Sequence, residues 1–77
     1  MKVTYFGEVA ELTSTTSEDV TLEHNALSDL ITHLKSTYNL KIEDIHIAVN
    51  HNLVSKDEEL DLKDGDEIAI LSPFAGG

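Results

Sequence analysis

The chain has 77 residues, carries a formal net charge of −10 at pH 7 and contains no cysteine. A chain of this length forms one small domain, and without cysteine it has no disulfide, thiolate metal site or cysteine nucleophile. The acidity excludes nucleic acid and anionic membrane surfaces as expected partners, because both require a basic face. Three explanations of the acidity remain open: a basic protein partner, the solubility of a small domain, or adaptation to high salt.

No segment has the pattern of a targeting or membrane-spanning sequence. The opening Met1-Lys2-Val3 is not followed by the apolar region of a signal peptide. No apolar run approaches the roughly 20 residues that cross a bilayer. We therefore expect a cytoplasmic protein without a membrane partner.

Two strands are predicted near the start of the chain. The first is 2–7, where alternating polarity turns Val3 and Tyr5 toward the core and leaves Phe6 on the more polar face. The second is 19–23, which alternates in the same way and is expected to pair antiparallel with the first. The segments between the two strands are a predicted short helical turn and a predicted loop, 8–12 and 13–17.

A helix follows, because five apolar residues recur at the spacing of one helix face. These residues are Leu27, Leu30, Ile31, Leu34 and Tyr38. Asn25 precedes the stripe and is a suitable N-cap. Asn39 tolerates the left-handed geometry with which many helices end.

Three further strands are predicted in the second half of the chain. Residues 45–49 alternate in polarity, and a turn at 50–52 leads into a short edge strand at 53–54. After an acidic loop that contains the turn signal Asp64-Gly65, the last strand spans 67–71. Its inward residues are Ile68 and Ile70, and its outward residues are Ala69 and Leu71.

This order of elements predicts an α+β domain of two layers, in which one main helix covers one face of a mixed sheet of four to five strands. The ubiquitin-like β-grasp has this order, with its first and last strands side by side at the centre. We expect a single domain over 1–77, with a flexible C-terminal tail at 72–77.

The sequence contains no recognisable catalytic or metal-binding set. The four histidines are scattered, so we expect them on the surface and expect no metal site. The acidic segment 57–61 lacks the oxygen spacing of a calcium loop and predicts a solvated loop. We therefore expect no cofactor bound by this chain.

The C-terminal segment carries the functional signal. Its six residues are Ser72, Pro73, Phe74, Ala75, Gly76 and Gly77. They are too few and too small to pack a core, yet in extended form they reach roughly 20 Å beyond the sheet. The last two residues have no side chains, so the tail fits a narrow channel. A carboxyl group at Gly77 would thus be presented inside the active site of a partner.

A carboxylate reacts with nucleophiles only after activation. Adenylation by ATP would turn the carboxyl group of Gly77 into an acyl donor, and sulfide would then give a thiocarboxylate with a nucleophilic sulfur. The chain itself supplies no general acid or base. The partner must provide these groups and exclude water from the reaction.

Three segments carry a resemblance to a known family. They are Val3-Thr4-Tyr5-Phe6-Gly7 with Glu11-Leu12, Ala48-Val49-Asn50-His51-Asn52-Leu53-Val54, and Asp64-Gly65-Asp66-Glu67-Ile68-Ala69-Ile70-Leu71-Ser72-Pro73-Phe74-Ala75-Gly76-Gly77. On these residues the chain resembles the small subunits of molybdopterin synthase, within the ubiquitin-like sulfur-carrier family. It departs from them at Ala10, where many relatives have arginine, and at Ser72, where a second proline is usual. The contact made by that arginine is therefore not carried over.

The resemblance implies that an ATP-dependent activating enzyme adenylates Gly77 and that a sulfurtransferase route supplies the sulfur. The loaded chain then docks on the large synthase subunit and donates sulfur to cyclic pyranopterin monophosphate, which becomes molybdopterin. The implied assembly is a heterotetramer with two large subunits at its centre. This chain is then a sulfur carrier and not an enzyme by itself.

Two other functions share the fold and the glycine pair. One is the sulfur carrier of thiazole synthesis for thiamin. The other is a protein modifier that is joined through Gly77 to lysines of its targets. The sequence leaves both open as alternatives, together with the choice between molybdenum and tungsten.

Strand parity also predicts a docking surface. Phe6, Ala69 and Leu71 face away from the core on strands that are neighbours in a β-grasp, and Phe74 extends the patch along the tail. A contiguous apolar patch beside a reactive chain end is where an interface is expected. We expect these four residues to bind the partner, with the acidic residues around them steering its approach.

Overall fold

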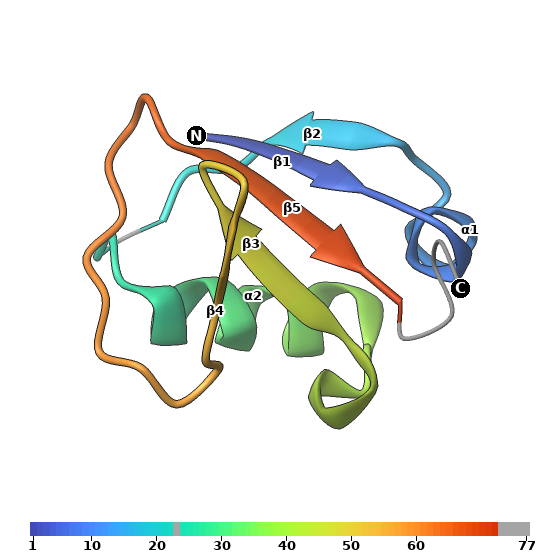
Figure 1. Ribbon diagram of the computed structural model, residues 1–77. Coiled ribbons are helices and arrows are strands. Elements are labelled where there is room, and N and C mark those ends of the chain that lie inside the picture. Colours follow the sequence, from blue (N-terminus) through green and yellow to red (C-terminus); the bar gives the residue numbers. More distant parts are fainter. Residues whose placement is uncertain (23, 73–77) are drawn as a thin grey trace.

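The computed structural model describes residues 1–22 and 24–72, and a five-stranded mixed sheet runs through it (Figure 1). The strands are β1 (Lys2–Tyr5), β2 (Ser17–Asp19), β3 (His46–Val49), β4 (Asn52–Val54) and β5 (Glu67–Leu71). Their order across the sheet is β2-β1-β5-β3-β4, with β1 parallel to β5 and the other neighbours antiparallel. The first and last strands therefore lie side by side, which confirms the predicted β-grasp topology.

Helix α2 (Leu27–Tyr38) crosses one face of the sheet and closes the core (Figure 1). The predicted apolar stripe is confirmed: Leu27, Leu30 and Leu34 are fully buried, and the other two members are partly buried. The stripe shares one core cluster with inward residues of β1, β3 and β5, namely Val3, Tyr5, Ile47, Ile68 and Ile70. Each fully buried aliphatic side chain contributes about 1.5–3 kcal/mol, so this layer contact dominates the stability of the domain.

Two short helices complete the fold. Helix α1 (Glu8–Thr13) confirms the predicted helical turn after the first strand, and η1 (Ile42–Asp44) is one turn of 3-10 helix before β3. The ammonium group of Lys56 donates to the carbonyl oxygens of Ile42 (2.7 Å) and Ile45 (3.0 Å), which ties the segment after β4 to η1. None of the helices in residues 1–22 and 24–72 is both long and apolar enough to cross a membrane.

The N-terminus of α2 differs from the sequence prediction. Its N-cap residue is Ala26, and no side chain caps the helix, so the predicted cap at Asn25 is wrong. The first backbone N–H, that of Leu27, instead donates to the carbonyl oxygen of Leu60 (2.9 Å), and Leu62 N–H donates to the carbonyl oxygen of Asn25 (2.6 Å). The acidic loop thus supplies a backbone acceptor for one of the N–H groups that a helix start leaves unpaired, and its second bond fixes the loop beside this helix end.

The second strand lies earlier than the predicted range 19–23. The first strand, predicted at 2–7, ends at Tyr5, because Gly7 at φ 60° turns the chain into α1. β2 pairs with it from Ser17, opposite Thr4, to Asp19, opposite Lys2. Val20 continues the pairing by donating its N–H to the carbonyl oxygen of Met1 (2.8 Å). Val20 is buried and Leu22 is partly buried. The predicted antiparallel pairing with the first strand is therefore confirmed, and so is the inward orientation of Val20 and Leu22, but the predicted bounds of the second strand are wrong.

Candidate functional site

The predicted tail begins where β5 ends, at the edge of the sheet beside α1 (Figure 1). Five of the predicted site residues lie outside the described residues: Pro73, Phe74, Ala75, Gly76 and Gly77. Ser72 was assigned to the tail as well, but it is only 6% exposed and belongs to the folded domain. The described site is therefore the root of the tail and the surfaces on either side of it.

Three of the predicted docking residues meet on the face of the sheet opposite α2. Ala69 and Leu71 alternate with the buried residues of β5, and Phe6 follows β1 with 45% of its side chain exposed. The N–H of Phe6 donates to the carbonyl oxygen of Ile70 (3.0 Å), which holds Phe6 beside β5. All three line one depression, which we call the sheet-face hollow. The structure thus brings these three residues together, their role in docking stays a prediction, and the fourth member, Phe74, lies outside the described residues.

Two more residues of the sheet-face hollow were not predicted as docking residues. Ala48 of β3 pairs with Ala69 on one side and with Leu53 of β4 on the other. The two alanines form a floor of small side chains, and Leu53, 72% exposed, borders it on the edge strand. Sequence parity placed Ala48 on the outer face, but only the strand order shows that it continues the row from Ala69 to Leu53.

The end of the sheet-face hollow farthest from the tail root is polar. Lys2 and Glu67 pair across β1 and β5, and Nε2 of His51 lies 3.3 Å from Oε2 of Glu67. Glu67 and His51 are both well exposed, so their contact contributes little to stability. The hollow is therefore apolar beside the tail root and charged at its far end, and a partner would have to match both ends.

The turn between β3 and β4 is pinned to β5 by Asn50. Its Oδ1 accepts from the N–H of Glu67 (3.0 Å), and its Nδ2 donates to Oδ1 of Asp66 (3.0 Å). This bond from Asn50, followed by one from the N–H of Lys63, holds the pKa of Asp66 below its ordinary value. Asn50 and His51 both have positive φ, 51° and 72°, as a tight two-residue hairpin turn requires. The position of β4 beside the hollow is thus fixed by side-chain hydrogen bonds.

A carboxylate on β2 joins the sheet to α2. Oε1 of Glu18 accepts from the phenol of Tyr5 (2.9 Å), Oε2 accepts from the phenol of Tyr38, and Nε2 of His33 lies 3.6 Å from Oε1. The rings of Tyr5 and Tyr38 meet edge to face at 5.9 Å. Burial opposes the charge on Glu18, yet the hydrogen bonds from Tyr38 and Tyr5 lower its pKa. Burial, with Glu18 adding to it, raises the pKa of Tyr5 above its ordinary value.

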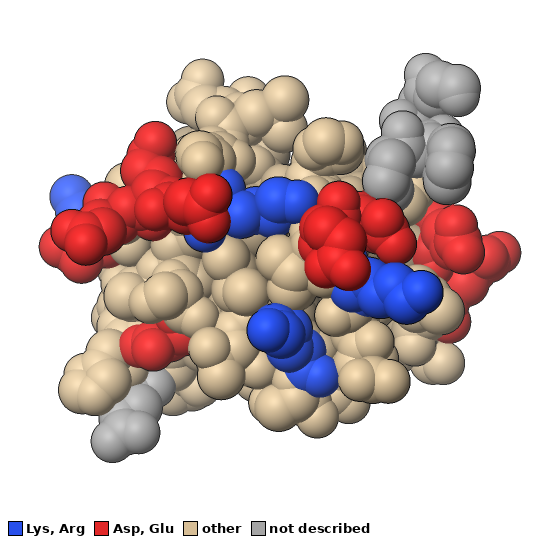
Figure 2. Space-filling model, turned by 90° about the horizontal axis from the view of Figure 1, so that it is seen from below, with Lys and Arg blue, Asp and Glu red and all other residues tan. Residues whose placement is uncertain are grey.

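Charge on the helix face of the molecule is mixed. Figure 2 shows acidic side chains in several groups with lysines between them, so the described part of this face has no continuous basic surface. Residues 1–22 and 24–72 contain no cluster of three histidine or acidic side chains arranged to hold a metal ion.

Known proteins share both the sequence and the fold. Residues 3–77 match the model of the ThiS family. The chain is 35% identical over 82 residues to the molybdopterin synthase sulfur carrier subunit of Escherichia coli (strain K12), covering 100% of this chain and 99% of that protein. It is 32% identical over 81 residues to the protein of the same name from Dictyostelium discoideum, covering 99% and 94%.

Two solved structures are similar over nearly the whole chain. One is the complex of subunits 1 and 2 of molybdopterin-converting factor from Helicobacter pylori 26695, with a TM-score of 0.69, 29% identity and coverage of 99% and 96%. The other is small archaeal modifier protein 1 from Methanosarcina acetivorans, with a TM-score of 0.68, 28% identity and coverage of 99% and 94%.

The sheet order and the single covering helix define a ubiquitin-like β-grasp domain. Two relatives at more than 30% identity match it from end to end, and the family match extends to residue 77. The chain therefore belongs to the ThiS family, among the molybdopterin synthase sulfur carrier subunits.

Proposed function

We propose that this chain carries sulfur as a thiocarboxylate on Gly77 and donates it within molybdopterin synthase. The observation that supports this most is the match to the E. coli sulfur carrier subunit, which covers the whole chain including Gly76 and Gly77. The substrate would be cyclic pyranopterin monophosphate, which receives two sulfur atoms and becomes molybdopterin. The chain acts in the cytoplasm as a carrier, and the large subunit is the catalyst.

Loading requires an activating enzyme. Attack of the Gly77 carboxylate on ATP forms an acyl-adenylate and releases pyrophosphate. A sulfur donor of the sulfide oxidation level then displaces AMP, which leaves the C-terminal carbonyl carbon bonded to sulfur. ATP is thus used by the activating enzyme, and this chain binds no cofactor of its own. The source of the sulfur is a separate sulfurtransferase.

Delivery requires docking, for which the sheet-face hollow is the proposed surface. Phe6 and Leu71 offer apolar contact beside the tail root, and Leu53 extends that contact across the sheet. Phe74 would continue the contact along the tail. The partner is the large subunit, consistent with the H. pylori complex of subunits 1 and 2, and two copies of each subunit would form a heterotetramer. The charged far end of the hollow would orient the partner.

Removal of Gly77 tests the proposal. The truncated chain should fold normally and accept no sulfur, because the reacting carboxyl group would no longer lie at the end of the glycine pair. Intact-mass measurement after incubation with activating enzyme, ATP and a sulfur donor should show one oxygen replaced by sulfur in the full chain alone. Glu11→Ala, at an exposed position on α1, is the control and should load normally. Loading of the truncated chain, or sulfur on any side chain, would contradict the proposal.

A second function is a protein modifier joined through Gly77 to lysines. It is favoured by the 28% identity with the archaeal modifier protein of M. acetivorans over 99% of this chain. Digestion of cell extracts would reveal it as Gly-Gly remnants on lysines of other proteins. Abundant remnants, together with normal molybdenum cofactor in a deletion strain, would favour the protein modifier over the sulfur carrier.

A further inference from the structure

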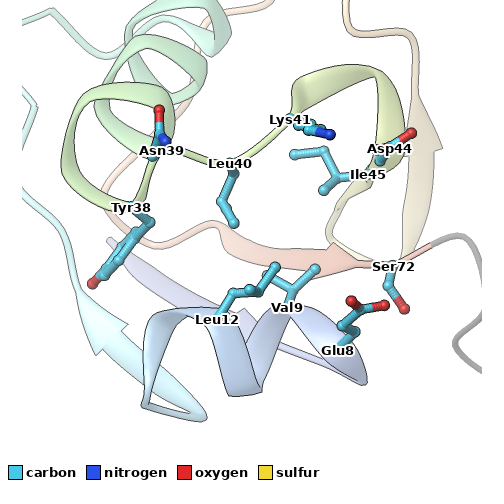
Figure 3. A pocket seen from close by; sticks show the side chains of 10 residues that line it. All are labelled: Glu8, Val9, Leu12, Tyr38, Asn39, Leu40, Lys41, Asp44, Ile45 and Ser72. Carbon is cyan, nitrogen blue, oxygen red and sulfur yellow. The ribbon is translucent and has the colours of Figure 1, made fainter.

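A second depression opens on the other side of the tail root. It lies between α1, the end of α2 and η1, and we call it the helix-side hollow (Figure 3). Val9 and Leu12 of α1 point into it from one side, and Leu40 points toward them from the other (Figure 3). Leu12 is 59% exposed, one of three large apolar side chains exposed in the described part of the chain. Ser72 forms part of the wall.

The helix-side hollow is separate from the sheet-face hollow, the proposed docking surface. Side chains alternate along β5, so Leu71 borders the sheet-face hollow and Ser72, the next residue, borders the helix-side hollow. The tail therefore leaves the domain between two depressions on opposite faces. Leu12 is not among the residues of the sheet-face hollow, which includes Phe6 and Leu71.

We propose that the helix-side hollow is a seat for the C-terminal segment of the same chain, residues 73–77, with the ring of Phe74 against Leu12 and Leu40. Phe74 follows Ser72 by two residues, a distance of at most about 7 Å along an extended chain, so the ring reaches the hollow without rearrangement of the domain. Residues two apart share one side of an extended chain, so an extended segment 72–74 would turn Phe74 to the side of Ser72 and away from that of Leu71. Phe74 is also the large apolar residue of this segment.

The segment of the same chain fits better than a second copy. Two copies would bring together domains that each carry a net charge of −10. The wall of this hollow has two acidic residues, Glu8 and Asp44, against one basic residue, Lys41, and so does not offset that repulsion (Figure 3). Covalent attachment gives Phe74 a high effective concentration at the hollow, which no free partner shares. The seat is thus occupied from within the chain.

An occupied seat would compete with delivery of the tail. A partner that draws the tail into a channel binds only those molecules whose tail has left the seat. Its apparent affinity is then the intrinsic affinity multiplied by the fraction of molecules with a free tail. This consequence for loading depends on the proposed function of Gly77, whereas the contact of Phe74 with the hollow does not.

Nuclear magnetic resonance of the full chain tests the seat directly. We expect nuclear Overhauser contacts between the Phe74 ring and the methyl groups of Leu12 and Leu40. Phe74→Ala should shift those methyl resonances and leave the methyl groups of Leu53, on the opposite face, unchanged. Leu12 and Leu40 resonances that do not respond to Phe74→Ala overturn the proposal. So do resonances that respond only when the large subunit is added, because the hollow is then a seat for the partner.

Loading kinetics test the competition. With activating enzyme below saturation, Leu12→Ala should raise the rate about two- to fivefold, as expected if half to four-fifths of the molecules hold the tail in the seat. Leu12 is well exposed, so its replacement leaves the fold intact, and Glu11→Ala on the same helix is the matched control. An unchanged or lower rate for Leu12→Ala overturns the competition. If wild type accepts no sulfur, the proposed function is wrong. The nuclear Overhauser contacts of Phe74 would still show whether the tail occupies the helix-side hollow.

Discussion

Replacement of Glu18 is expected to loosen the contact between α2 and the sheet. Its carboxylate accepts hydrogen bonds from Tyr5 on β1 and from Tyr38 on α2, and only 27% of the Glu18 side chain is exposed. Glu18→Ala removes both acceptors at once. The phenol of Tyr5, a residue that is 2% exposed, then loses its carboxylate acceptor and keeps only the phenol of Tyr38 beside it.

The size of the effect follows from these contacts. A hydrogen bond to a charged group contributes about 1.5–3 kcal/mol, and stranding a buried donor adds a desolvation penalty of about 1–3 kcal/mol. The two bonds share one partly exposed carboxylate and are not additive, so we expect Glu18→Ala to lower the free energy of unfolding by about 2–3 kcal/mol. For a domain of this size that corresponds to a fall in Tm of about 8–24 °C.

Urea unfolding and thermal melts of Glu18→Ala, Tyr38→Phe and the double mutant measure the effect. We expect a coupling free energy of about 1 kcal/mol or more between the two positions, because each single change breaks the same bond. Glu11→Ala is the control for loss of an exposed carboxylate and should change stability by about 0.5 kcal/mol or less. A Glu18→Ala protein as stable as this control would refute the reasoning.

The Glu18 cluster also sets a pH dependence. The pKa of Glu18 is lower in the folded chain than its ordinary value of 4.5, so its contribution is fully present above that value. It is lost as the pH falls through the lower, folded pKa. The stability difference between wild type and Glu18→Ala should therefore shrink on acidification, and a difference that grows toward acid would contradict the assignment.

Three further changes have distinct expected outcomes. Phe6→Ala or Leu71→Ala should weaken binding to the large subunit by about 1–3 kcal/mol in calorimetric titration, with little change in thermal melts. Normal binding by the folded variants would show that the sheet-face hollow is not the docking surface. Lys56→Met should lower the free energy of unfolding by about 1–3 kcal/mol, because two carbonyl groups at η1 lose their donor; an unchanged melt would show that water replaces it. Asn50→Ala should destabilise the domain more than Asn50→Gly in the same melts, because glycine adopts the positive φ of residue 50 without strain and alanine does not. Equal losses of stability in the two variants would mean that the whole effect comes from the side-chain hydrogen bonds of Asn50.

The elements that could be predicted from the sequence are those whose signal is local. The last strand was predicted at 67–71, the range that β5 occupies, because four consecutive apolar residues lie between an acidic turn and a proline. The end of α2 at Asn39 was predicted for a similar reason, and this residue has the left-handed φ of 57°. The start of α2 was not, since Leu60 supplies its acceptor from a segment more than 30 residues away. That contact exists only after the chain has folded.

In the candidate site, too, the features with a local sequence signal were predicted and those that depend on distant contacts were not. Parity along single strands was sufficient to group Phe6 with Leu71, because the β-grasp topology makes their strands neighbours. Leu53 was missed because its position depends on the register of β4 against β3. The cluster at Glu18 was missed for another reason: its partners lie 13 and 20 residues away, with no periodicity that relates them. The role of Gly77, which lies outside the described residues, stays a prediction.

The parallel pairing of β1 with β5 has a practical consequence for measuring these interactions. Two parallel neighbours begin at the same edge of the sheet, so Met1 and Ser72 are separated by the length of a strand, about 17 Å for five residues. The ammonium group of Met1 contacts the exposed Asp19 (2.9 Å), a surface pair whose loss changes stability little. An affinity handle or biosensor anchor added ahead of Met1 would therefore leave the tail root free to meet its enzymes, whereas the same handle added after Gly77 would block the group being studied.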